Sequence, residues 1–167
     1  MIAMPLEYEH EENCFSQHHA FPGNAAMIEQ VAHQLGEDTI LAVTNHPLTE
    51  LYGDTSAVVS AVFEQRGKVR LIPGDEIHGL TTLALARYCD GFVVGNSKSW
   101  SAAAFWGTPI ARLSRFATGA WVNAYDDVTD LAGDLALGKA RAFEPVDPAR
   151  WQPALEHHSE WAGKVPA

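Results

Sequence analysis

The sequence predicts an α/β domain in which a mostly parallel sheet lies between two layers of helices. Short apolar runs alternate along the chain with longer segments whose apolar residues recur at helical spacing. The apolar runs lack polar alternation, which indicates strands buried on both faces, as in parallel sheets covered by helices. At 167 residues the chain can bury a proper core. We therefore expect one Rossmann-like three-layer domain over residues 1–167.

The first half of the chain predicts two helix–strand pairs after an entry segment, residues 1–23, that we expect to be irregular. Residues 24–35 carry apolar side chains on one helical stripe, and a glycine follows as a stop signal. The run 39–44 (TILAVT) is apolar and ends at Asn-His-Pro, which is typical of a strand. The same reasoning predicts a helix over 55–67 and a strand over 68–74.

The second half continues the alternation. A helix is expected over 76–89, a strand over 91–94 (GFVV), a short helix over 98–106 and a strand over 109–114. Two further helices are expected after these elements, over 126–138 and 147–161, the last preceded by a proline-containing linker. Strands separated by helices in this way favour parallel pairing throughout.

Composition and charge exclude several classes of function. The formal net charge of −10 argues against nucleic acid or an anionic membrane surface as the main partner, because both require a basic surface. No apolar run approaches the roughly 20 residues of a membrane span, and the first residues do not resemble a signal peptide. The 2 cysteines fit a reducing compartment. We therefore expect a cytoplasmic protein.

The sequence GNSKS after the strand 91–94 is the main candidate for ligand binding, because ligands of such sheets bind beyond the carboxyl ends of strands. Gly95 permits a sharp turn, and Ser97 is expected to cap the following helix. The amides of Lys98 and Ser99 would then be free to hold a phosphate. The alternative is that Ser97 only caps the helix and that Lys98 is solvated.

A second candidate lies after the strand 39–44. Pro47 disfavours a helical conformation of His46, so the histidine is expected at the strand tip, outside any helix. There it can donate a hydrogen bond to a phosphate or a carboxylate. A purely structural role for His46 is the alternative.

The order of these pieces resembles a known family. The stretch ILAVTNHP, followed by VRLIPGDEIHGLTTLALARYCDGFVVGNSKSWSAAAFWGTPIARL, is similar to the carboxyl-terminal half of capsular-polysaccharide-synthesis glycosyltransferases. These include the bacterial Kdo transferases, which have the two-domain GT-B fold. The similarity covers roughly residues 39–113, and MPLEYEHEENCF also resembles the segment that enters this half. It implies that the chain is the donor-binding half of a GT-B enzyme.

The resemblance assigns roles residue by residue. His46, Asn96 and Ser97 match residues beside the donor phosphates, and Lys98 and Ser99 complete that loop. The backbone of Ile72, Pro73 and Gly74 corresponds to the place where the nucleotide base rests. Gly107 and Pro109 match a structural Gly-x-Pro.

Three positions depart from the pattern of the family. Ala102 stands where the family has a glutamate that touches the sugar or ribose, Lys98 stands for threonine, and Trp100 stands for glycine.

A complete GT-B enzyme also needs an amino-terminal acceptor domain, and too few residues precede position 39 to form one. We therefore expect a nucleotide-sugar donor, linked to CMP or UDP, and an acceptor domain from a partner chain, or a homo-oligomer. No other cofactor is expected. The alternative is a non-catalytic α/β scaffold or interaction module derived from such an enzyme.

The segment HEENCFSQHH raises the alternative of a metal site, with His10, Glu12, Cys14, His18 and His19 as possible ligands. HExxC differs from the HExxH pattern of metalloproteases, and adjacent histidines point to different sides of a regular element. We therefore expect no metal site.

Contacts with sugars are expected from two other places. Trp121 lies in a glycine-containing loop, where its ring can stack on a sugar face, and Arg115 lies at the preceding strand end. The acidic residues of the entry segment are candidates to face an acceptor sugar: Glu7, Glu9, Glu11 and Glu12.

Overall fold

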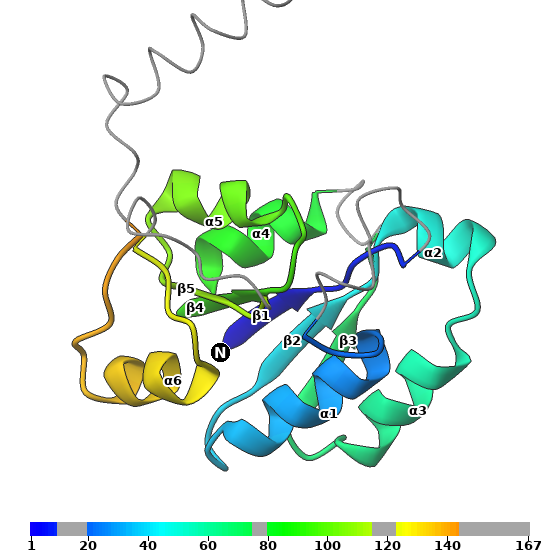
Figure 1. Ribbon diagram of the computed structural model, residues 1–167, viewed down its shortest axis with the longest axis horizontal. Coiled ribbons are helices and arrows are strands. Elements are labelled where there is room, and N and C mark those ends of the chain that lie inside the picture. Colours follow the sequence, from blue (N-terminus) through cyan, green and yellow to red (C-terminus); the bar gives the residue numbers. More distant parts are fainter. Residues whose placement is uncertain (10–19, 75–79, 115–122, 144–167) are drawn as a thin grey trace, which may run out of the picture.

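The computed structural model describes residues 1–9, 20–74, 80–114 and 123–143 (Figure 1). Within these ranges a five-stranded, all-parallel sheet has the order β3-β2-β1-β4-β5. Its strands are Ile2–Pro5 (β1), Leu41–Thr44 (β2), Val69–Ile72 (β3), Gly91–Val94 (β4) and Ile110–Arg112 (β5). The helices are Asn24–Gln34 (α1), Pro47–Tyr52 (α2), Ser56–Glu64 (α3), Thr81–Tyr88 (α4), Trp100–Trp106 (α5) and Val128–Ala136 (α6). The predicted Rossmann-like fold is confirmed.

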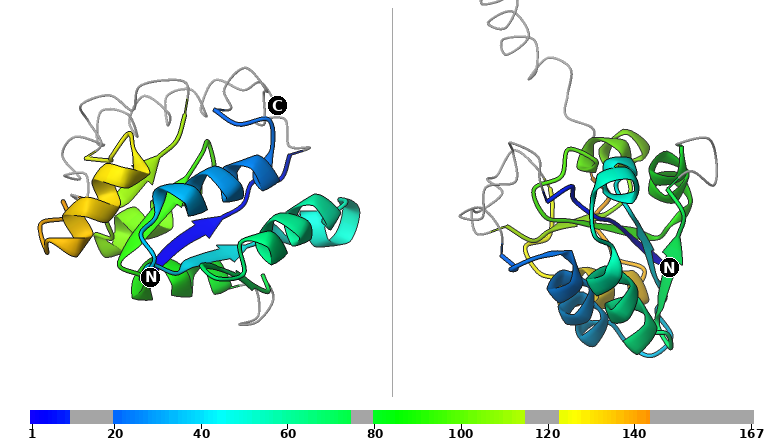
Figure 2. Two further views of the ribbon diagram at one scale, coloured as in Figure 1. Left: turned by 90° about the horizontal axis from the view of Figure 1, so that it is seen from below. Right: turned by 90° about the vertical axis from the view of Figure 1, so that its right-hand side faces the viewer.

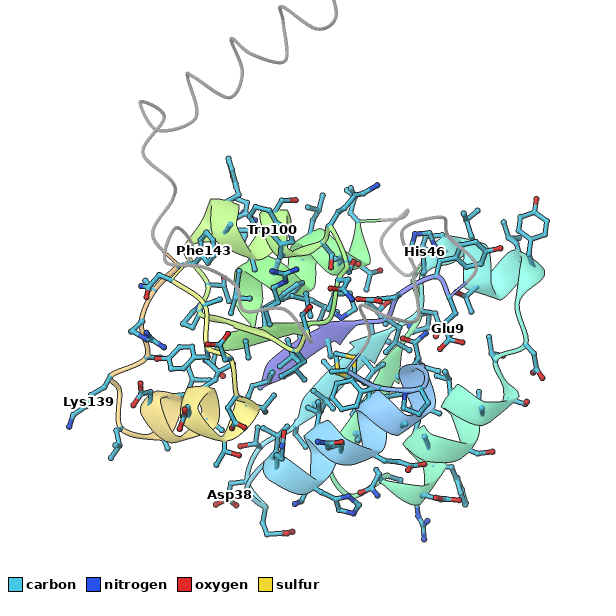
Figure 3. The ribbon with its side chains drawn as sticks, in the orientation of Figure 1. Glu9, Asp38, His46, Trp100, Lys139 and Phe143 are labelled. Carbon is cyan, nitrogen blue, oxygen red and sulfur yellow. The ribbon has the colours of Figure 1, made fainter. Side chains whose placement is uncertain are left out.

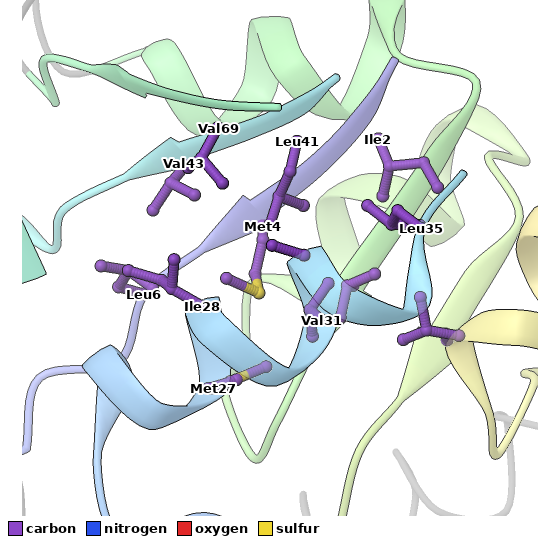
Figure 4. Close-up of a cluster of buried hydrophobic side chains, with 14 of the residues drawn as sticks. Ile2, Met4, Leu6, Met27, Ile28, Val31, Leu35, Leu41, Val43 and Val69 are labelled. Carbon is purple, nitrogen blue, oxygen red and sulfur yellow. The ribbon is translucent and has the colours of Figure 1, made fainter. Parts of the chain in front are cut away.

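Helices cover both faces of the sheet. α1, α3 and α6 pack on one face, and α4 and α5 on the other (Figures 1 and 2). Successive residues of a strand point to opposite faces, so Met4 of β1 joins the cluster under α1, whereas Ala3 joins the cluster under α4 and α5. Figure 4 shows Met4 among Ile28, Val31 and Leu41, all fully buried. The continuous apolar runs in the sequence follow from this burial on both faces.

The expectation that residues 1–23 are irregular is wrong for Ile2–Pro5, which form β1 at the centre of the sheet. All four residues are buried. A short apolar run that ends in proline is a weak strand signal by itself. Its two neighbours in the sheet, β2 and β4, stabilise β1 as a strand. Because both neighbours are distant in the sequence, the residues around β1 alone do not predict this pairing.

Pro5 also shapes the edge of the sheet where ligands bind. The N–H groups of Ile2 and Leu6 both donate toward β2, so by the alternation of a strand the backbone nitrogen of residue 5 faces β4. Proline has no N–H to donate there. Pairing of β1 with β4 ends at Ala3–Phe92, whereas pairing with β2 continues to Pro5. β1 and β4 therefore stop pairing before β1 ends.

The predicted elements other than the last helix are found, but several are shorter than predicted. α3 ends at Glu64 and not at 67, and β3 and β5 lie within the predicted ranges 68–74 and 109–114. The starts of helices differ as well. α2 was not predicted, although Pro47 at its first turn favours a helix start. α4 begins at Thr81 and α5 at Trp100, later than the predicted 76 and 98. Within the described ranges, none of the helices is long and apolar enough to cross a membrane. The predicted helix 147–161 lies outside these ranges.

Candidate functional site

The candidate site lies at the carboxyl edge of the sheet, between β1 and β4. Because all strands are parallel, the segments that follow them meet at this one edge. The chain leaves β1 toward β2 on one side and leaves β4 toward β5 on the other, so the strand order reverses between β1 and β4. Ligands of open α/β sheets bind at such a switch point. The early end of the β1–β4 pairing lies at the same place.

Glu7 occupies this switch point. Its carboxylate accepts a hydrogen bond from the backbone N–H of Asn96. It also lies against Gly95, where a Cβ atom would come within 2.6 Å of Oε1. Asn24 fixes the backbone of Glu7, since its Oδ1 accepts from the Glu7 N–H at 3.2 Å and its Nδ2 donates to the Glu7 carbonyl at 2.8 Å. The turn after β4 therefore binds an anionic group, which is the Glu7 carboxylate of the same chain.

Asn96 joins three of the segments at this edge. Its N–H binds Glu7 from the segment after β1, and its Oδ1 accepts from the Ser114 hydroxyl, after β5, at 3.1 Å. The predicted phosphate residue Asn96 thus lies at the switch point. Its backbone N–H and its side chain are both engaged there.

The prediction that the backbone amides of Lys98 and Ser99 are free to hold a phosphate is wrong for Ser99. The Ser99 N–H donates to the Ser97 hydroxyl at 3.2 Å, and the two hydroxyls are 2.9 Å apart. Ser97 thus caps the turn that precedes α5 and occupies the Ser99 amide. The N-cap of α5 itself is Ser99, and no side chain caps the helix, so the prediction that Ser97 caps this helix is wrong. The Lys98 side chain is exposed. α5 spans only 7 residues, so its dipole is a weak source of anion binding.

His46 has the extended backbone that Pro47 imposes, with φ −68° and ψ 136°, but it is also the N-cap of α2. Its Nδ1 accepts from the Leu48 N–H at 3.2 Å. In the neutral ring Nε2 then carries the proton and is the nitrogen able to donate to a ligand. The ring stacks on Tyr8, with centroids 5.5 Å apart. The expectation that His46 lies at the strand tip, outside any helix, is thus confirmed, and the helix α2 that starts directly after it was not expected.

The loops after β2 and β3 lie on one side of Glu7. β1 separates His46 from Asn96 in the sheet order, so the two residues lie on opposite sides of the β1 segment. Ile72, Pro73 and Gly74 follow the edge strand β3, farther out on the His46 side. The Pro73 carbonyl accepts from the Thr81 hydroxyl at 3.1 Å, which ties this predicted base loop to α4.

A second carboxylate of the β1 segment binds the start of α1. Glu9 Oε1 accepts from the Asn24 N–H at 2.6 Å, and a Cβ atom on Gly23 would lie 3.0 Å from it. An acidic group is favourable there because of the helix dipole. Of the four glutamates expected to face a sugar, Glu7 and Glu9 thus bind backbone amides, and Glu11 and Glu12 lie outside the described residues.

Two hollows adjoin these carboxylates. The one at the switch point, between Glu7, Asn24 and Asn96, has about 10 Å³ of free space, enough for one water molecule at most. The other has about 140 Å³ and lies between the starts of α1 and α3 and the α2 segment, with Glu9, Thr49 and Asp54 in its wall. A backbone hydrogen bond from Ser56 lowers the pKa of Asp54, so this carboxylate stays ionised down to acidic pH.

Sequence reasoning missed one further feature of this edge. Asn45 Oδ1 and Thr44 Oγ1, at the end of β2, are buried and have no hydrogen-bond partner among the described residues. Buried polar atoms are nearly always paired, so these two oxygens are candidates for a ligand contact. The signal in the sequence that indicates this ligand-contact candidate is an asparagine directly after an apolar strand run.

Other predicted residues are not placed. Arg115, Trp121 and the histidine-rich segment 10–19 lie outside the described residues. In the part of the chain that the structure describes, no group of three or more His, Cys, Asp or Glu side chains could hold a metal ion. Comparisons with protein-family models, with curated proteins and with solved structures found no match.

Proposed function

We propose that this chain is the nucleotide-sugar-binding domain of a glycosyltransferase that acts in bacterial capsular-type polysaccharide synthesis. Another chain would provide the acceptor domain. One observation carries the proposal: at the switch point of the sheet, the Asn96 N–H and Gly95 form a turn that binds a carboxylate. A phosphate oxygen has the same charge and accepts the same hydrogen bond. The resemblance of residues 39–113 to the donor half of such enzymes supports this function.

In the proposed complex a donor phosphate replaces the Glu7 carboxylate on the Asn96 N–H. The ammonium group of Lys98 follows two residues later in an exposed position. Both groups stabilise the negative charge that grows on the leaving phosphate as the sugar is transferred. The chain contributes this electrostatic part of the reaction, and the partner's acceptor domain contributes the rest.

His46 serves a different part of the donor. Neighbouring strands lie about 4.8 Å apart, so loops that follow β2 and β4, with β1 between them, are separated by about 10 Å. This span fits two different groups of one nucleotide better than a single phosphate. The hollow lined by Glu9, Thr49 and Asp54 is on the His46 side of the site and offers oxygen acceptors for hydroxyl groups of a sugar.

One observation favours the alternative of a non-catalytic module. The carboxylate of Glu7 already occupies the turn after β4, and position 102 of α5 carries alanine in place of the glutamate expected from the resemblance. A chain that fills its own anion site is consistent with an interaction module that no longer binds a donor.

Calorimetric titration with CMP, UDP and their sugars separates the two functions. The proposal predicts binding that Lys98→Ala weakens about ten-fold or more, because a charge-assisted contact is worth roughly 1.5–3 kcal/mol. Lys139→Ala is the matched control: it removes the same charge from an exposed position after α6. No binding at millimolar nucleotide, or equal losses in both variants, would overturn the proposal.

A further inference from the structure

The hollow between the starts of α1 and α3 is large enough for one ring of a ligand. It has about 140 Å³ of free space, and a cavity of roughly 150 Å³ holds a benzene ring. Its wall comes from the segment after β1, the starts of α1 and α3, and α2. In Figure 3 its lining residue Glu9 lies on the same side of the molecule as His46, away from Asp38. The hollow is therefore at the carboxyl edge of the sheet, as is the switch point.

The charged side chains in the wall of this hollow are acidic. Among the described residues that line it, Glu9 and Asp54 carry charge, and none is Lys, Arg or His. Each carboxylate binds the start of a helix: Glu9 accepts from the Asn24 N–H, and Asp54 Oδ1 accepts from the Ser56 N–H at 2.8 Å. A carboxylate has about four acceptor positions. Both groups can therefore accept further hydrogen bonds from a ligand.

Two buried oxygens on this side of the sheet have no hydrogen-bond partner among the described residues. One is Oγ1 of Thr49, a residue of α2 that lines the hollow. The other is Oδ1 of Asn45, which is 7% exposed. Asn45 lies two residues beyond Val43, hence on the face of β2 that α1 and α3 cover. Buried polar atoms are nearly always paired, and an amide oxygen can only accept. These oxygens therefore indicate a ligand that donates hydrogen bonds.

We propose that this hollow holds the sugar of the donor and selects it by charge, binding an amino sugar best, a neutral sugar less well and a sugar acid least. The inference rests on the function proposed above and names the class of sugar. Ammonium and hydroxyl groups donate to the oxygens around the hollow. A sugar carboxylate cannot donate, and it would bring a further negative charge beside Glu9 and Asp54.

Calorimetry with UDP-glucosamine, UDP-glucose and UDP-glucuronate tests the selection, because the amino sugar and the sugar acid each differ from glucose at one group. Mildly acidic pH keeps the amine protonated, and Asp54 stays ionised there because the hydrogen bond from Ser56 lowers its pKa. UDP-glucosamine should bind about three- to ten-fold more tightly than UDP-glucuronate, with UDP-glucose between them. Equal affinities, or tightest binding of UDP-glucuronate, would overturn the selection and leave nucleotide binding intact.

Asp54→Asn locates the selection in the hollow. Asparagine keeps an oxygen that can accept from the Ser56 N–H, so the start of α3 keeps its cap while the charge is lost. The ratio of the two affinities should fall about three-fold. Asp38→Asn is the matched control, since it removes the same charge from an exposed position before β2, at the opposite edge of the sheet. A ratio that changes equally in both variants, or in neither, would overturn the proposal.

Glucosamine without a nucleotide separates this inference from the proposed function. In an NMR titration of the ¹⁵N-labelled chain, glucosamine should shift the amides of Gly53 and Ala57, which line the hollow, and should leave Gly67, before β3, unmoved. If no UDP compound binds, the proposed function fails, and shifts at Gly53 and Ala57 still support the hollow as a sugar site. If no UDP compound binds and these two amides also stay unmoved in glucosamine, both are overturned.

Discussion

The Glu7 carboxylate lies where a side chain at position 95 would be: a Cβ atom on Gly95 would come within 2.6 Å of Glu7 Oε1. The two residues are 88 positions apart in the sequence, and their contact joins the segments after β1 and β4 at the switch point. Glycine at 95 is thus required by this approach and not by an unusual backbone angle. The approach of Glu7 thus explains why position 95 carries glycine.

Gly95→Ala should therefore destabilise the protein mainly through Glu7. We expect a loss of about 1–3 kcal/mol, as for an overpacked site, that falls to near zero when Glu7 is also replaced by alanine. Urea unfolding of the two single variants and the double variant measures this coupling. An equal loss with and without Glu7 would contradict the pairing.

Gly133→Ala provides the opposite case. Gly133 lies within α6, and nothing lies within 4 Å of a Cβ atom built there. Alanine should stabilise the helix by about 0.5–1 kcal/mol. A higher urea midpoint checks this, and a lower one would show that Gly133 contacts a surface.

Glu7→Gln should strengthen nucleotide binding several-fold, because it removes the negative charge that competes with phosphate for the Asn96 N–H. Glu29→Gln changes the net charge equally at an exposed position of α1 and should leave the affinity unchanged. Calorimetry compares the two variants. Weaker binding in Glu7→Gln alone would mean that the carboxylate is itself a ligand contact.

Asp127 is expected to be a stabilising cap of α6. Its Oδ1 accepts from the N–H groups of Thr129 and Asp130 at 2.6 and 3.4 Å. Asp127→Ala should lower the free energy of unfolding by about 1 kcal/mol. Asp126→Ala, at the exposed neighbouring position, should have a much smaller effect. Similar losses from both would argue against the capping role.

Cys89 is expected to make the free energy of unfolding depend on pH in the alkaline range. Burial raises the pKa of its thiol from 9.0 to about 11. Between these values the unfolded chain loses the proton while the folded chain keeps it, so stability falls as the pH rises through 9 to 11. Urea unfolding across this range should show a steeper fall for the parent chain than for Cys89→Ala. Parallel curves would contradict the raised pKa.

The sequence predicted the elements whose signals are local. β4 was predicted at its observed bounds, since its apolar run stands between Asp90 and Gly95. The central strand β1 was missed because its stability comes from β2 and β4. The hydrogen bond from the Asn96 N–H to the Glu7 carboxylate was missed for a similar reason. Sequence patterns do not show a contact between residues 89 positions apart, nor do they show which anionic group binds the turn after β4.

The central claim is that a nucleotide phosphate binds at the switch point between β1 and β4. Amide chemical shifts of the ¹⁵N-labelled chain, followed by NMR during titration with CMP and UDP, test it residue by residue. The account predicts saturable shifts for Gly95, Asn96 and Asn24, and none for Gly36 and Gly67, which precede β2 and β3 at the opposite edge of the sheet. Unmoved amides at Gly95 and Asn96 in millimolar nucleotide, or shifts confined to the opposite edge, would contradict it.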